Sequence, residues 1–120
     1  MGLVEFLTAR YYEDEAIARA VPFEHYEAVE YLWETKYLQL TCDNGETGAT
    51  SEMNAHIADH AARHDPARVL ADIAAKRRLL ESHDDALLEG DEVSMWMARC
   101  LAAPYADHPD YNPAWAVDAA

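Results

Sequence analysis

Positive charge is scarce in this chain. Only nine of its 120 residues are Lys or Arg, against 23 Asp or Glu, and the formal net charge is −14. Affinity for DNA or RNA backbones comes mainly from Lys and Arg side chains that displace phosphate counterions. The composition therefore predicts neither direct nucleic-acid binding nor attachment to an anionic membrane surface.

Cysteines and long apolar runs are also scarce. Cys42 and Cys100 are far apart, and no CxxC pair or signal-like N-terminus accompanies them. We therefore expect a reduced, cytoplasmic protein, with a disulfide between the two cysteines left open as an alternative. No apolar run approaches the roughly 20 residues that span a bilayer.

Familiar catalytic signatures are missing as well. The chain contains no nucleophile elbow, phosphate-binding loop or HExxH sequence. The sequence thus leans toward a role without catalysis and indicates no cofactor.

What the chain does contain is enough apolar material for a core. Apolar residues make up 51% of it and aromatic residues 10%, which favours one globular domain over residues 1–120. The acidic residues are spread over both halves of the chain. Such a surface suits rapid encounter with a basic partner and allows mimicry of a nucleic acid; the alternative is that it only keeps the protein soluble.

Apolar periodicity and capping residues predict several helices. Residues 3–20 form an amphipathic pattern with one apolar face, made of Leu3, Phe6, Leu7, Tyr11 and Ile17. A second helix is expected from Ser51 or Glu52 through His64. Asp65 and Pro66 then suit the cap and first position of a helix that extends to about His83. A last helix is expected over residues 91–103.

The segment 24–42 permits two interpretations. Tyr31, Trp33 and Tyr37 share parity with Val29, which suits strands, although the same region also carries a helical stripe. Aromatic and β-branched residues favour the strands. The expected fold is mainly α: a small domain of three or four helices with a short β-hairpin over residues 28–42. An extended C-terminal tail, anchored by Tyr105, Tyr111 and Trp115, completes it.

Two sequence segments, HDPARVL within residues 60–83 and PYADHPDY within residues 101–115, carry a family resemblance. With the opening LVEFLTARYYEDEAIARA, they resemble a family of small uncharacterised proteins from actinobacteria and their phages. Many members of that family have a cysteine cluster before the tail, with zinc-like spacing. The corresponding residues here, DDALLEGDEVSMWMA, contain no cysteine, so the resemblance does not imply a zinc site in this chain.

Three groups of residues are candidates for sites. His56, His60 and His64 recur every four residues and could hold a metal, but local helix roles are favoured, so no metal site is predicted. Five of the nine positive charges lie in residues 60–78, and we expect Arg68 and Arg77 to meet Asp107 or Asp110 as a structural clasp to the tail.

The third group is aromatic and acidic. Its members are Tyr31, Trp33 and Tyr37, with Glu30 and Glu34 between them. Aromatic residues dominate binding hot spots and acidic residues steer basic partners; the alternative is that these rings form the core. The functional hypothesis is a non-enzymatic phage or prophage accessory protein that binds a basic host protein. The alternative hypothesis is a metal-dependent enzyme built on the histidines.

Overall fold

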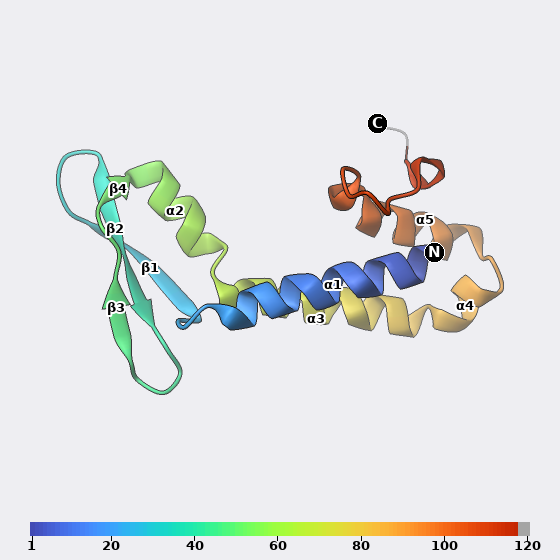
Figure 1. The fold of residues 1–120 in the computed structure, drawn as a ribbon, viewed down its shortest axis with the longest axis horizontal. Helices are drawn as coiled ribbons and strands as arrows, with labels where there is room; N and C mark the ends of the chain where they lie inside the picture. Colours follow the sequence, from blue (N-terminus) through green and yellow to red (C-terminus); the bar gives the residue numbers. More distant parts are fainter. Residues whose placement is uncertain (118–120) are drawn as a thin grey trace. The chain divides into compact units, whose positions relative to one another are not determined.

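The computed structural model describes residues 1–117 and contains both helices and a sheet (Figure 1). In the part that is described, five α-helices and two 3₁₀ turns together account for 56% of the residues, and a four-stranded antiparallel sheet for 15%. The expectation of a mainly α fold with one short hairpin is therefore wrong, because two further strands extend the hairpin into a sheet.

The chain divides into two compact units, residues 1–14 with 73–120, and residues 15–72. The prediction of a single domain stays a prediction.

The first unit, called the helical unit below, contains the start of α1 (Leu3–Ala20) and the end of α3 (Pro66–Ser82). It continues through α4 (Asp84–Leu88), α5 (Glu92–Ala102) and two 3₁₀ turns, η1 (Ala103–Tyr105) and η2 (Pro113–Trp115). Its buried apolar residues come from every one of these α-helices: Leu3, Phe6, Leu7, Tyr11, Ile73, Leu80, Leu87, Ala98 and Ala102.

Phe6 is the centre around which the C-terminal tail folds. This ring is fully buried, and the rings of Tyr105, Tyr111 and Trp115 approach it with centroid distances of 6.2, 5.9 and 5.1 Å. The aromatic anchoring of the tail is thus confirmed, although 3₁₀ turns interrupt the tail. The Tyr105 hydroxyl also donates a hydrogen bond of 2.5 Å to Asp14 Oδ2.

The second unit, called the sheet unit, contains strands β1 (His25–Glu30), β2 (Thr35–Thr41), β3 (Thr47–Ala49) and β4 (Met53–Asn54). Strand β2 is central, and β1 pairs along one edge of it. On the other edge, β4 pairs with the first residues of β2 and β3 pairs with the last ones. Helix α2 (Ala55–Arg63) contacts β1 and β2 and lies against one face of the sheet (Figure 1).

The register shows which side chains α2 covers. Successive side chains on a strand point to opposite faces, and Lys36 Nζ reaches Asp59 Oδ1 on α2 at 2.7 Å. Leu38, the buried residue of β2, therefore shares the α2 face with Lys36. Val29 and Tyr37, which are paired across β1 and β2, lie on the opposite face.

Several predicted element boundaries agree with the structure. Helix α1 begins and ends as expected, α3 begins at Pro66, and Asp65 caps it by accepting a 2.9 Å hydrogen bond from the Arg68 N–H. The helix expected from Ser51 or Glu52 begins only at Ala55, because Met53 and Asn54 pair with β2 and Asn54 caps α2.

One buried position on α1 was predicted wrongly. Ile17 is 69% exposed, while its neighbour Ala18 is buried. Periodicity identifies the apolar face of a helix but not which part of that face another element covers. Over residues 1–117 no helix has the combined length and apolar character that a bilayer crossing requires.

Candidate interaction surface

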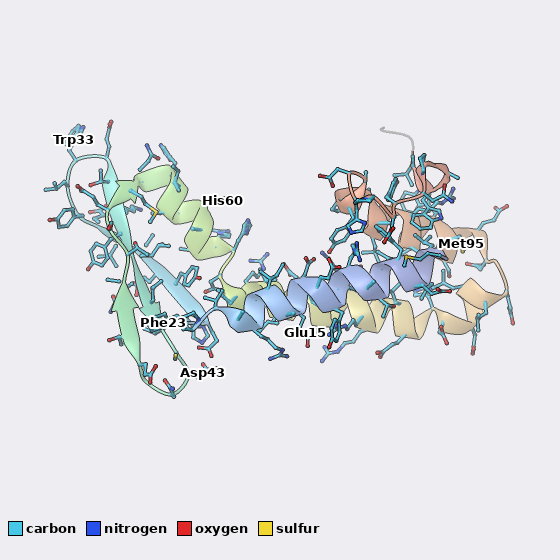
Figure 2. The ribbon with its side chains drawn as sticks, in the orientation of Figure 1. Glu15, Phe23, Trp33, Asp43, His60 and Met95 are labelled. Carbon is cyan, nitrogen blue, oxygen red and sulfur yellow. The ribbon has the colours of Figure 1, made fainter. Side chains whose placement is uncertain are left out.

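The loop between β1 and β2 presents large apolar side chains to solvent. Tyr31, Leu32 and Trp33 are 60%, 63% and 88% exposed. Figure 2 shows Trp33 at the tip of this loop, pointing away from the strands and from α2. Two rings of the predicted aromatic group, those of Tyr31 and Trp33, therefore lie outside the core of the sheet unit, where Leu38 and Ala58 are buried, and Tyr37 is partly buried.

Hydrogen bonds fix the conformation of this loop. The Tyr31 N–H donates to the Thr35 carbonyl at 3.2 Å, and the Thr35 N–H donates to the Leu32 carbonyl at 3.1 Å. The Leu32 N–H donates to Thr35 Oγ1 at 3.1 Å. The exposed rings thus lie on a loop that three hydrogen bonds to or from Thr35 close.

A further bond connects the loop to α2. Glu34 has φ of 59°, a left-handed conformation that costs a non-glycine residue about 1 kcal/mol. Its carbonyl oxygen accepts a hydrogen bond from the Ala55 N–H at 3.0 Å, at the beginning of α2. This bond joins the loop to the start of α2 and helps to hold Glu34 in its left-handed conformation.

Tyr31 and Tyr37 form the inner part of the surface. Their rings meet edge to face, with centroids 6.3 Å apart and an interplanar angle of 83°. Together with residues 49–52 they line a concavity of about 390 Å³. We call Tyr31, Leu32, Trp33, Tyr37 and Glu52 the aromatic patch.

Two carboxylates belong to this region. Glu52 of the patch is exposed, and its Oε2 accepts a hydrogen bond of 3.1 Å from the Thr35 hydroxyl, while Glu34 is exposed on the loop itself. Glu30 is also exposed but pairs with Lys36 across β1 and β2, on the face that α2 covers. The nearby Lys36 is already paired with Asp59. Residues 15–72 contain 11 acidic and four basic side chains, so the electrostatic potential over this unit favours cations.

The predicted histidine group is only partly assembled. His60 on α2 and His64, just after its end, have ring centroids 4.5 Å apart, edge to face. His56 lies one turn earlier on α2 and is exposed. Within the described 117 residues, no three His, Cys, Asp or Glu side chains are arranged to hold a metal ion, and no observation favours the metal-enzyme alternative.

The structure gives contacts for three of the four predicted clasp residues, Arg68, Arg77 and Asp110. Arg68 Nε lies 3.5 Å from Asp72 Oδ1, one turn along α3. Arg77 lines a concavity of the helical unit with Tyr11 and Asp84. His108 Nδ1 accepts a hydrogen bond from the Asp110 N–H, and its ring lies 5.6 Å from that of Phe6. Pairing of Arg68 or Arg77 with Asp107 or Asp110 stays a prediction.

Sequence reasoning missed several residues that matter here. Leu32 and Glu52 belong to the aromatic patch, but Glu52 is distant in sequence and joins it through strand pairing. The bond from Tyr105 to Asp14 spans 91 positions. No local sequence pattern identifies Glu52 as part of the patch or Asp14 as the partner of Tyr105. Cys42 and Cys100 are both free thiols, and Cys42 Sγ lies 2.9 Å from the Pro22 carbonyl oxygen.

These features define a small mixed α/β protein with an acidic, aromatic surface on its sheet unit. The chain belongs to a family of unknown function, DUF6221, whose model matches residues 1–117. No curated protein and no solved structure matched this chain.

Proposed function

We propose that this protein acts by binding a basic segment of another protein through the aromatic patch. The observation that supports this most directly is the ordered loop that exposes Tyr31, Leu32 and Trp33. Burying these side chains against a partner would contribute roughly 25 cal/mol of binding free energy per Å² of apolar surface. The free chain lacks this contribution because the side chains are exposed to solvent.

Charge supports a basic partner. The net charge of −14 raises the rate of encounter with a cationic surface, and the carboxylates of Glu34 and Glu52 disfavour acidic partners. Aromatic residues at the centre with charged residues at the rim are the usual anatomy of a binding hot spot. Affinity is thus assigned to the rings, and partner selection to the charges.

The proposed setting is that of an accessory protein of phage or prophage origin in the cytoplasm of a host cell. Its support is the resemblance of the HDPARVL and PYADHPDY segments to proteins of actinobacteria and their phages. Where the basic partner is itself a nucleic-acid-binding protein, the acidic surface would occupy its groove, and duplex DNA would compete with this chain for the partner.

A titration with defined peptides tests the proposal. A fluorescently labelled peptide rich in both Lys and Arg is titrated with the full chain at low and at physiological salt, and binding is followed by anisotropy. Trp33→Ala should weaken binding by about tenfold, the effect of removing a hot-spot aromatic residue. Tyr12→Ala is the matched control, because Tyr12 is 72% exposed on α1, outside the patch.

The two variants separate specific from general attraction. General attraction to the acidic chain would leave Trp33→Ala and Tyr12→Ala equal in affinity, and that result would contradict the proposal. Absence of binding by the unaltered chain at low salt would contradict it as well. Circular dichroism of each variant shows whether its fold is intact.

A further inference from the structure

The concavity beside the loop has the features of a site for one cationic side chain. Tyr31 and Tyr37 form one part of its lining, and residues 49–52 form the other, with the Glu52 carboxylate among them. Its volume of about 390 Å³ lies near the lower end of the range for ligand sites. A space of this size suits a single inserted side chain.

The two tyrosine rings can attract a cation. They meet nearly at right angles, at 83°, so the contact uses the edge of one ring and one face of the other. The remaining ring faces carry the negative side of the aromatic quadrupole, and Tyr31 is 60% exposed. A cation placed over such a face is attracted electrostatically.

Glu52 adds a full negative charge at the same place. Its Oε2 accepts a hydrogen bond from the Thr35 hydroxyl, which orients the carboxylate. A carboxylate has about four lone-pair sites, so this bond leaves acceptor capacity for a donor in the concavity. Thr35 Oγ1 also accepts a hydrogen bond from the Leu32 N–H, so one hydroxyl connects the Glu52 carboxylate to the aromatic loop.

We infer that the concavity formed by Tyr31, Tyr37 and Glu52 binds an arginine side chain of the basic partner. The guanidinium group is planar, stacks on aromatic faces, and donates paired hydrogen bonds to a carboxylate. A lysine ammonium would make the charge contact but not the stacking or the paired bonds. This inference rests on the proposed function and gives it a specific residue to recognise.

The test compares two peptides of equal charge. One alternates arginine with serine and the other alternates lysine with serine, and both are titrated with the full chain at physiological salt. The unaltered chain should bind the arginine peptide about threefold to tenfold more tightly. Tyr37→Leu and Tyr31→Leu should remove most of that preference, while Tyr37→Phe, which keeps the ring, should retain it.

Glu52→Gln provides an independent arm. It removes the charge but keeps the shape, so it should weaken binding of the arginine peptide and reduce the salt dependence of the affinity. Because Thr35 can still donate to the amide oxygen, the loop should remain folded. Thermal unfolding of each variant is the check, with Tyr37→Phe as the reference for an unperturbed sheet.

The outcomes distinguish the two proposals. Equal affinity for both peptides, or an arginine preference that survives both leucine variants, would overturn the arginine site. If Trp33→Ala still weakened binding in that case, the proposed function would stand without it. Failure of the unaltered chain to bind either peptide, even at low salt, would overturn both.

Discussion

At the scale of single residues, the sheet unit shows how a local hydrogen bond changes the chemistry of a side chain. His25 Nε2 lies 2.8 Å from Asp43 Oδ1, which joins the start of β1 to the turn after β2. This hydrogen bond raises the pKa of His25, and the charges of Asp43, Asp65 and Glu24 act in the same direction, against a smaller effect of desolvation. The imidazolium form is therefore favoured in the folded chain.

We predict a pH-dependent contribution to stability from this pair. Because the pKa of His25 is raised on folding, the contribution is fully present below the unfolded-state value of about 6.5. It is lost as pH rises through the raised pKa of the folded state. NMR titration of the His25 ring should give a higher pKa in the unaltered chain than in Asp43→Asn. An unchanged pKa in that variant would contradict the assignment.

In the helical unit, burial raises the pKa of two phenols, those of Tyr11 and Tyr105. Burial, with a smaller effect of the Asp14 charge, raises the pKa of Tyr11 to about 12, and burial is also the largest cause of the raised pKa of Tyr105. Both phenols therefore stay neutral at physiological pH. In that form the Tyr105 hydroxyl can donate its proton to Asp14.

At the scale of elements, the C-terminal tail is held by side chains and not by regular secondary structure. Its 3₁₀ turns are three residues long each, and such turns contribute little by themselves. The four rings around Phe6 supply the contacts, and the Arg10 guanidinium lies 5.3 Å from the centre of the same Phe6 ring. The tail is therefore an integral part of the helical unit.

Phe6→Ala should consequently destabilise the chain strongly. Removing a fully buried phenylalanine costs about 3–5 kcal/mol in free energy of unfolding, and urea denaturation followed by circular dichroism measures it. Tyr12→Ala, on the exposed side of α1, should cost far less. A loss below about 1 kcal/mol for Phe6→Ala would mean that the tail does not depend on this ring.

The two faces of the sheet are also an element-scale property. Helix α2 covers the face of Leu38, while Tyr37 and Val29 lie on the other. The Phe23 ring packs against β3 at Gly48. A Cβ atom at residue 48 would lie only 3.0 Å from the Phe23 ring. The absence of a side chain at residue 48 thus allows the ring to lie close to the strand.

At the scale of the whole molecule, acidic charge is the dominant property. The formal net charge is −14, and the described ion pairs involve few of the 23 acidic residues. Like charges on a compact chain repel one another, and this repulsion lowers the stability of the folded state. The same charge would favour the proposed association with a cationic partner, so stability and that binding should respond to salt in opposite directions.

Salt should therefore stabilise the free chain. Between about 10 and 200 mM NaCl the Debye length falls from about 30 Å to below 10 Å, which screens repulsion between carboxylates. The urea midpoint should rise over this range, while affinity for a basic peptide should fall. A urea midpoint that falls with added salt would contradict the repulsion argument.

Local sequence patterns determined α1 and the start of α3, but not the start of α2 or the presence of α4. The apolar stripe of α1 and the Asp65 and Pro66 start of α3 depend on neighbours within a few positions, so they could be predicted. The aromatic composition of the tail predicted its anchoring, but not that Phe6 is the residue on which it packs. The extended sheet could not. Asn44 and Gly45 turn the chain between Thr41 and Thr47, so β3 pairs with the adjacent β2. The three residues of β3 include a glycine and carry no alternating apolar pattern by which the strand could be recognised.

The same distinction applies to the candidate site. The residue types of Tyr31, Trp33 and Tyr37 suggested a binding face or a core with equal force, because both uses need large aromatic side chains. Tertiary structure excludes the core for two of these rings, because Tyr31 and Trp33 are exposed while Leu38 of β2 and Ala58 of α2 are buried. Their use as a binding face stays a prediction. Acidity and the bounds of α1 and the start of α3 were therefore determined by the sequence alone. The start of α2, the pairing of β4 and the exposure of side chains depend on contacts between residues far apart in the chain.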